Sequence, residues 1–219
     1  MRFRIDLKIF IFILLFYLTK QIESYAMIMF FAILHEFGHL LAGLLLRMKP
    51  EKMEIMPYGV SIAFQITQKD YNQKIRKGNQ LELKKIVVAL AGPLTNVMII
   101  IIASQMKVNV FEGLMVLYAN LLLVLFNLLP IYPLDGGRIL KGVLHIFFGK
   151  RKAETYVNRI SFVTLILVTF VASILIYQVE NIAIFLIVLV LWGIFIREDR
   201  IYERRNKIYK LAKKSIEIK

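Results

Sequence analysis

Six apolar blocks constrain the fold of this chain more than any other feature of its sequence. A helix needs roughly 20 apolar residues to cross a bilayer, and 58% of the chain is hydrophobic, above the about 45–50% of soluble domains. We therefore expect an all-α polytopic membrane protein. About six transmembrane helices would form a core in residues 1–196, followed by a basic cytoplasmic tail in residues 197–219. The blocks cover residues 7–19, 25–46, 86–106, 113–132, 160–177 and 181–196.

The Lys and Arg residues predict the orientation of these helices. With the N-terminus in the cytoplasm, 27 of the 29 basic residues fall in cytoplasmic segments, and Lys20 and Lys107 lie outside. This asymmetry follows the positive-inside rule, so we expect both termini in the cytoplasm. The rule, together with contact between the tail and anionic lipid headgroups, accounts for the net charge of +14. We therefore expect the lipid bilayer, and no nucleic acid, as a partner.

The segment HEFGH at residues 35–39 carries the clearest chemical signal. On a helix, His35 and His39 lie on one face, so both can direct a ring nitrogen at one metal ion. Glu36 lies about 100° round the helix, where it can act as general base for a water whose pKa zinc lowers toward about 7. The alternatives are a chance match and a metal-free polar network. The network leaves unexplained why both histidines share a face.

A zinc site with an open position for water needs a third protein ligand. The chain has no cysteine, which also excludes a thiol protease and a disulfide framework, so an acid is the natural donor. Asp135 lies at a break in an apolar region, in the segment NLLPIYPLDGGRIL. Irregular backbone at membrane depth must be buried in protein or line a wet cavity, so we expect Asp135 to complete the site. The alternative is an ordinary cytoplasmic turn in which Asp135 caps the following helix.

Residues 51–66 predict a small membrane-associated β-hairpin after the second helix. Apolar residues alternate on either side of the turn PYG, which is a strand pattern and not a helical one. An exposed strand edge beside a metal could pair with a substrate peptide and hold it extended. We expect Val60, Ile62 and Phe64 to form this substrate-pairing strand. The alternative is an amphipathic hairpin that lies on the membrane surface.

Three motifs, HEFGH, ALAGPLTN and NLLPIYPLDGG, follow one another along the chain. In this order they resemble the site-2 protease family of intramembrane zinc metalloproteases, in particular its sporulation branch, the stage IV sporulation protein FB type. The resemblance covers roughly residues 5–205. It implies His35, His39 and Asp135 as ligands of one Zn²⁺ per chain, and Glu36 as the catalytic base.

The resemblance also implies roles for residues outside the ligand set. Asn127 would lie near the active site, where its amide could hold substrate backbone or the developing oxyanion. The alternative is that Asn127 satisfies helix carbonyls that the chain break sets free. Gly92 and Pro93 match a Gly-Pro pair of the family, which permits close helix approach and a local kink. Asn96 can hydrogen-bond across helices in the same block, and we take it to be structural.

The implied function is hydrolysis of peptide bonds in membrane-embedded or membrane-associated proteins of a bacterial cell membrane, as in regulated intramembrane proteolysis. A pro-sigma factor activated during sporulation is a candidate substrate, and an inhibitory membrane partner is a further candidate. The residues after the last block are too few for the nucleotide-sensing CBS domain common in the sporulation branch, which weakens the pro-sigma inference and any regulation by ATP. The alternatives are a membrane metal-ion transporter and a zinc-binding scaffold without protease activity. The sequence does not specify the oligomeric state.

Overall fold

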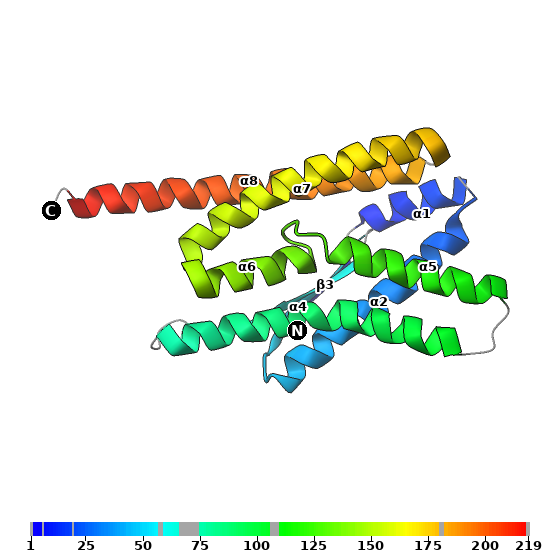
Figure 1. The fold of residues 1–219 in the computed structure, drawn as a ribbon, viewed down its shortest axis with the longest axis horizontal. Helices are drawn as coiled ribbons and strands as arrows, with labels where there is room; N and C mark the ends of the chain where they lie inside the picture. The colour runs from blue at the N-terminus through cyan, green and yellow to red at the C-terminus, as the bar shows by residue number, and fades with distance from the viewer. Residues whose placement is uncertain are drawn as a thin grey trace. The chain divides into compact units, whose positions relative to one another are not determined.

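The computed structural model describes residues 2–5, 7–18, 20–56, 59–65, 75–105, 110–179 and 182–217. These residues belong to two compact units, Met1–Leu128 and Leu129–Lys219. The first unit contains β1 (Arg2–Ile5), α1 (Lys8–Leu18), α2 (Ile22–Leu45), β2 (Pro50–Met56), β3 (Gly59–Phe64), α4 (Ile75–Gln105) and α5 (Val110–Asn127). The second contains α6 (Asp135–Phe148), α7 (Lys150–Val179) and α8 (Ile182–Glu217), as Figure 1 shows.

The apolar blocks of the sequence form helices. Among the described residues, three helices are long and apolar enough to cross a bilayer: Ile22–Leu45, Asn79–Gln105 and Lys150–Gln178. Two shorter apolar helices cover Ile9–Leu18 and Gly113–Asn127. The mostly helical fold is therefore confirmed, with helices that are long and apolar enough to cross a bilayer, while the count of six spans stays a prediction. The predicted division at residue 197 falls inside the continuous helix α8.

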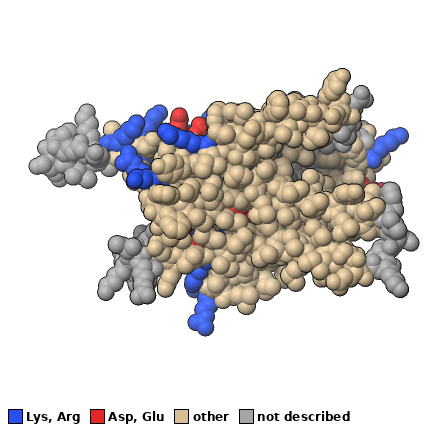
Figure 2. Space-filling model, viewed as in Figure 1, with Lys and Arg blue, Asp and Glu red and all other residues tan. Residues whose placement is uncertain are grey.

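Many outward-facing side chains of these helices are large and apolar. On α7, for example, Phe162 is 44% exposed and Phe170 is 65% exposed. A monomeric soluble protein rarely exposes contiguous apolar surface on this scale, whereas a bilayer offers it an apolar solvent. Figure 2 shows uncharged residues over most of the visible face, with Lys and Arg gathered over the C-terminal half of α8.

Small residues allow α2 and α4 to pack closely. A Cβ atom on Gly38 of α2 would overlap Thr95 Oγ1 and would lie 2.9 Å from the Ala91 carbonyl oxygen, both on α4. Glycine at such a position lets two helix backbones approach without a side chain between them. The predicted close approach at Gly92 is also present, and there the neighbours are the imidazoles of the HEFGH motif.

The predicted hairpin is confirmed as the antiparallel pair β2 and β3, with Met53 opposite Ile62. The sheet has three strands in the order β1-β2-β3, and β1 pairs in parallel with β2. Within the described part of the chain β3 is therefore an edge strand. Ile62 is buried, and the ring of Phe64 occupies the space that a side chain at Gly43 of α2 would need. The backbone of Val60 lies in β3, while its side chain is outside the described residues.

In the second unit, α7 and α8 lie side by side (Figure 1). The buried residues of α7 recur every four positions, at Ala153, Val157, Ser161 and Leu165, as expected for one face of a helix. Farther along α7, Trp192 Nε1 of α8 donates a hydrogen bond to Thr169 Oγ1 over 3.0 Å.

Three polar pairs join the two helices beyond the apolar part of α8. Asn158 Nδ2 donates to Asp199 Oδ1 over 2.8 Å, the hydroxyls of Thr155 and Tyr202 lie 3.1 Å apart, and Arg205 Nη1 donates to Glu154 Oε1 over 3.3 Å. Because the α8 partners are spaced by three residues, they lie along one face of the helix. The first turns of the basic segment are therefore held against α7.

Candidate metal centre

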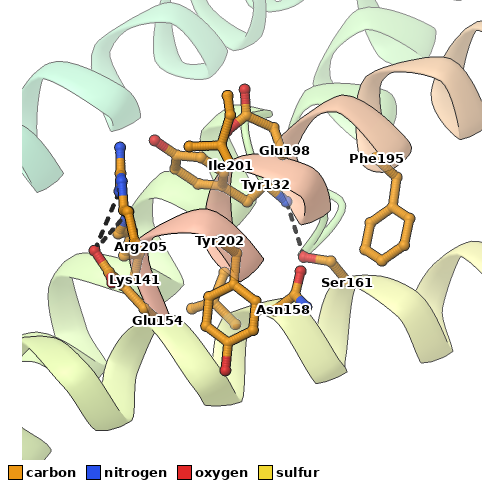
Figure 3. Close-up of a pocket in the computed structure, with 11 residues that line it drawn as sticks. Tyr132, Lys141, Glu154, Asn158, Ser161, Phe195, Glu198, Ile201, Tyr202 and Arg205 are labelled. Atoms are coloured by element: carbon orange, nitrogen blue, oxygen red, sulfur yellow. Dashed lines mark hydrogen bonds and ion pairs between the residues drawn. The ribbon is translucent and has the colours of Figure 1, made fainter. Parts of the chain in front are cut away.

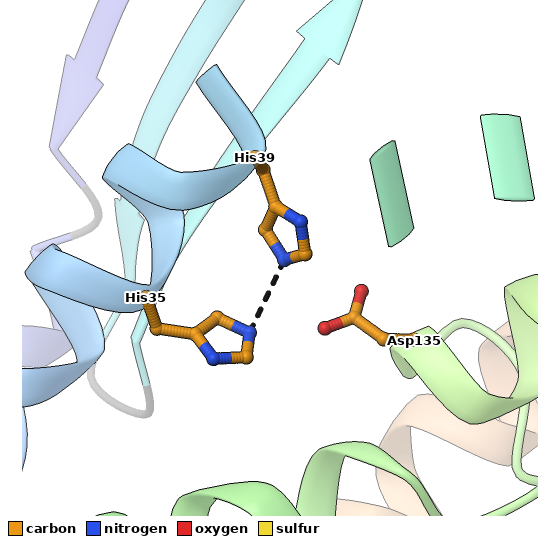
Figure 4. Close-up of side chains that lie close together, drawn as sticks. All are labelled: His35, His39 and Asp135. Atoms are coloured by element: carbon orange, nitrogen blue, oxygen red, sulfur yellow. Dashed lines mark hydrogen bonds between the residues drawn. The ribbon is translucent and has the colours of Figure 1, made fainter. Parts of the chain in front are cut away.

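The two histidines of the HEFGH motif face each other on α2 (Figure 4). They are one helical turn apart, each is 3% exposed, and their rings are nearly perpendicular, with centroids 4.8 Å apart. The Nε2 atoms lie 3.1 Å from each other. The structure thus brings together the two ring nitrogens that the spacing predicted.

Hydrogen bonds determine which nitrogen of His39 presents a lone pair to a metal. Nδ1 lies 2.6 Å from the Val88 carbonyl oxygen of α4. A carbonyl oxygen can only accept, so Nδ1 carries the hydrogen and donates it, and Nε2 presents a lone pair. The Gly92 N–H lies 3.3 Å from the same Nδ1, but the carbonyl contact is much shorter and therefore decides the tautomer.

His35 has the same tautomer. Its Nδ1 lies 2.6 Å from Asn96 Oδ1, an amide oxygen that can only accept, so Nε2 again presents a lone pair. Two such lone pairs repel each other at 3.1 Å unless a cation lies between them. Two nitrogen ligands of tetrahedral zinc, at Zn–N distances of about 2.0–2.1 Å, lie about 3.3 Å apart. The arrangement therefore fits a metal ion bound through both Nε2 atoms.

Gly92 of α4 packs directly against this pair. A Cβ atom there would overlap the His39 ring and would lie 2.5 Å from His35 Nε2. Glycine is therefore required by the position of the two rings, which is a more specific reason than close helix packing. Glu36 follows His35 on α2 and is half-buried.

Asp135 begins helix α6 in the second unit and is drawn in Figure 4. Its side chain is buried, and Oδ1 lies 3.5 Å from Arg138 Nη1 on the next turn. Leu134 occupies the N-cap position, so Asp135 is not the capping residue of α6. A carboxylate in the first turn is stabilised by the positive end of the helix dipole.

The loop before Asp135 is held from two sides within the second unit. The Tyr132 N–H donates to Ser161 Oγ of α7 over 3.0 Å, and this hydroxyl donates to the Pro130 carbonyl over 3.3 Å (Figure 3). On the other side, a Cβ atom at Gly137 would lie 2.5 Å from the backbone of Ile131. These contacts fix the backbone that leads into Asp135.

A small polar cavity of about 40 Å³ lies behind this loop (Figure 3). Buried Glu154 of α7 receives Arg205 of α8 at 3.3 Å and Lys141 of α6 at 3.9 Å. Lys141 Nζ also lies 4.3 Å from the centre of the Tyr132 ring. Glu198 also lines the cavity, so two carboxylates face two cations and the cavity is a charge-balanced junction of three helices.

Asn127, the predicted oxyanion or substrate residue, is the last residue of α5 and is half-buried. Its Nδ2 donates to the Leu123 carbonyl over 3.0 Å, so it satisfies a carbonyl of its own helix. This hydrogen bond matches the alternative reading of the sequence, in which Asn127 satisfies a helix carbonyl. The role of Asn127 toward substrate stays a prediction.

Sequence reasoning missed one residue near the site, Asn120 of α5, which lies behind Asn96. A single amide inside the apolar stretch YANLLL was the signal that could have identified it, since buried polar groups in a span need a partner.

The chain is similar in sequence to a peptidase family and to two known proteins. The family described as Peptidase family M50 matches residues 102–168. The chain is 32% identical over 129 residues to a zinc metalloprotease of Methanocaldococcus jannaschii, covering 55% of this chain and 34% of that protein. It is 25% identical over 129 residues to Stage IV sporulation protein FB of Bacillus subtilis, covering 56% of this chain and 41% of that protein. The match thus spans less than half the length of either relative.

A solved structure shows the same fold over most of the chain. The Site-2 Protease from Methanocaldococcus jannaschii superposes with a TM-score of 0.62 at 21% identity, covering 89% of this chain and 88% of that chain. The motifs, the matching family model and this fold point in one direction: the chain is similar to peptidase family M50 over residues 102–168 and shares the fold of a site-2 protease.

Proposed function

We propose that the protein is an intramembrane zinc metalloprotease that cuts membrane-embedded or membrane-associated substrates. The observation that carries the proposal is the histidine pair, whose Nε2 lone pairs face each other 3.1 Å apart inside an apolar helix. Each Nδ1 donates to an acceptor, as is usual for histidines that bind metals. A buried pair of this kind has no evident structural purpose without a cation.

The proposed ligands of one Zn²⁺ per chain are His35, His39 and Asp135. All three side chains are buried, and two imidazoles with one carboxylate are a donor set of catalytic zinc sites. Bound zinc supplies a Lewis acid that polarises the scissile carbonyl and makes water nucleophilic near neutral pH. Glu36 takes the proton from the attacking water and passes it to the leaving amine. Asn127 holds substrate backbone or the oxyanion.

The edge of β3 is the proposed docking place for the substrate. A helical peptide resists cleavage, because its scissile amide is hydrogen-bonded and shielded. Pairing with Val60, Ile62 and Phe64 of an edge strand holds the peptide extended by main-chain hydrogen bonds. Phe64 anchors the strand to α2, the helix that carries the histidines.

The finer features of the proposal concern location and substrate. We place the protein in a bacterial cell membrane with both termini in the cytoplasm, since the basic residues follow the positive-inside rule. A membrane-associated pro-sigma factor is the first substrate to test, because the chain is similar to a sporulation protein. The competing functions are a metal-ion transporter and a zinc-binding scaffold without protease activity.

The decisive experiment pairs zinc content with cleavage. Wild type, Glu36→Gln and the matched control Glu23→Gln, an exposed glutamate of the same helix, are purified in detergent and analysed for bound zinc. Each is then incubated with a membrane-anchored pro-sigma substrate and with unrelated membrane-anchored peptides. We expect about one zinc in all three proteins and cleavage by wild type and Glu23→Gln alone. Zinc binding without any cleavage would favour the scaffold or the transporter, and absence of zinc would overturn the metal site.

A further inference from the structure

Two asparagines connect the metal-binding face of α2 to helices α4 and α5. Asn96 of α4 and Asn120 of α5 are both 0% exposed, in helices that are otherwise largely apolar. Asn96 Nδ2 donates to Asn120 Oδ1 over 2.8 Å, and Asn120 Nδ2 donates to the Val116 carbonyl over 2.8 Å. Since Asn96 Oδ1 contacts His35, the chain of hydrogen bonds runs from a backbone carbonyl to the imidazole.

The carbonyl at the end of this chain sets its direction. The Val116 oxygen can only accept, so it must face the NH₂ group of Asn120. The oxygen of Asn120 then faces the NH₂ group of Asn96, and the oxygen of Asn96 faces His35 Nδ1. That nitrogen must therefore carry the hydrogen, which leaves Nε2 of His35 as the metal-binding atom.

The two histidines differ in how their tautomers are secured. His39 donates to the backbone carbonyl of Val88, an acceptor that no substitution removes. His35 relies on two side chains in sequence. Every buried side-chain nitrogen or oxygen of the described residues has a hydrogen-bond partner. Without the Asn120 oxygen, the NH₂ group of Asn96 loses its acceptor. The Asn96 amide is then able to turn and to present NH₂ to His35.

We infer that Asn120 is a positioning residue for metal binding, although it touches no ligand: through Asn96 it holds His35 in the tautomer that binds zinc. The inference rests on the proposed metal site, and it goes beyond the ligand set by naming the side chains that orient it. Removing a partner behind a metal-binding histidine typically weakens metal affinity about 10–100-fold. The effect of Asn120 should fall in that range.

Two substitutions at Asn120 separate positioning from stability. Asn120→Leu removes the oxygen that faces Asn96, so zinc affinity should fall about 10–100-fold. Asn120→Asp keeps an oxygen toward Asn96 and loses the NH₂ group that faces the Val116 carbonyl. It should therefore destabilise the protein but bind zinc about as tightly as wild type. Thr95→Val is the matched control, because the Thr95 hydroxyl donates to the Ala91 carbonyl of its own helix, outside the chain of hydrogen bonds.

The measurements are zinc affinity by chelator competition, the visible spectrum of the Co²⁺-substituted protein, and thermal unfolding. A purely structural role predicts that zinc affinity follows stability, so Asn120→Asp and Asn120→Leu would then lose affinity alike. That result would overturn the inference. The inference would also fail if Asn120→Leu bound zinc as tightly as wild type and gave the same Co²⁺ spectrum. If Asn120→Leu fails to fold, the test rests on Asn120→Asp. Zinc affinity like that of wild type in a less stable Asn120→Asp supports the inference, and weaker zinc affinity in that variant overturns it. Wild type that binds no zinc would instead refute the proposed function itself.

Discussion

Gly92→Ala tests the geometry of the histidine pair most directly. The added Cβ atom would overlap the His39 ring and would lie 2.5 Å from His35 Nε2. Heavy atoms in contact are normally about 3.5–4.0 Å apart, so the rings or the helices must move by about 1 Å. Overpacking of this kind costs about 1–3 kcal/mol. If the imidazoles take up the strain, zinc affinity falls about 5–150-fold.

The assay for Gly92→Ala is chelator competition for zinc in detergent, read together with thermal unfolding. Gly193→Ala is the control for the intrinsic effect of alanine in a helix, because a Cβ atom there has no neighbour within 4 Å. Gly38→Ala is the control for helix separation, because its Cβ atom would strike Thr95 and Ala91 but not the imidazoles. Wild-type zinc affinity in Gly92→Ala would refute the reasoning. An equal loss in Gly38→Ala would assign the effect to helix separation.

Four further predictions follow from contacts described above. Ser161→Ala leaves the part-buried Tyr132 N–H without its acceptor and should lower the free energy of unfolding by about 0.5–1.5 kcal/mol, measured by denaturant titration in detergent. An unchanged midpoint would contradict the role of Ser161 in holding the loop. Phe64→Ala should destabilise the protein by less than the about 3–5 kcal/mol of a fully buried Phe, because Phe64 is only partly buried. It should also raise KM for substrate if β3 is the docking strand. Arg205→Met should lower the midpoint of thermal unfolding, whereas Arg204→Met, an exposed neighbour, should not. Chelation of zinc should abolish cleavage but leave the circular dichroism spectrum nearly unchanged, because both Nδ1 hydrogen bonds persist without metal; unfolding on chelation would show that the metal is structural.

The features that local patterns specify were predicted correctly. The HEFGH spacing places His35 and His39 on one face, since helical periodicity alone decides that. Apolar runs predicted the long helices, and alternation on either side of a turn predicted the pair β2 and β3. In each case the decisive residues lie within one helix or one hairpin.

The features that depend on distant partners were not predicted. Strand β1 is only four residues long and pairs with residues about 50 positions away, so its own sequence carries no signal for that pairing. Gly92 was expected to assist helix packing, but its contact with the imidazoles appears only when α2 and α4 are placed together. For Asn120 the lone amide in an apolar stretch was a local signal, but its role depends on Asn96, which lies on another helix.

The three polar pairs between α7 and α8 fix the direction in which the C-terminal part of α8 extends. Helix α8 runs without a break to Glu217, and its contacts at Asp199, Tyr202 and Arg205 anchor it to α7. At 1.5 Å per residue, the 12 residues from Arg205 to Glu217 project about 18 Å beyond the last anchor. A small change in the tilt of α7 at Glu154 would therefore displace the C-terminal end of α8 by a larger distance. A fluorescent or spin label near Glu217 would detect that displacement.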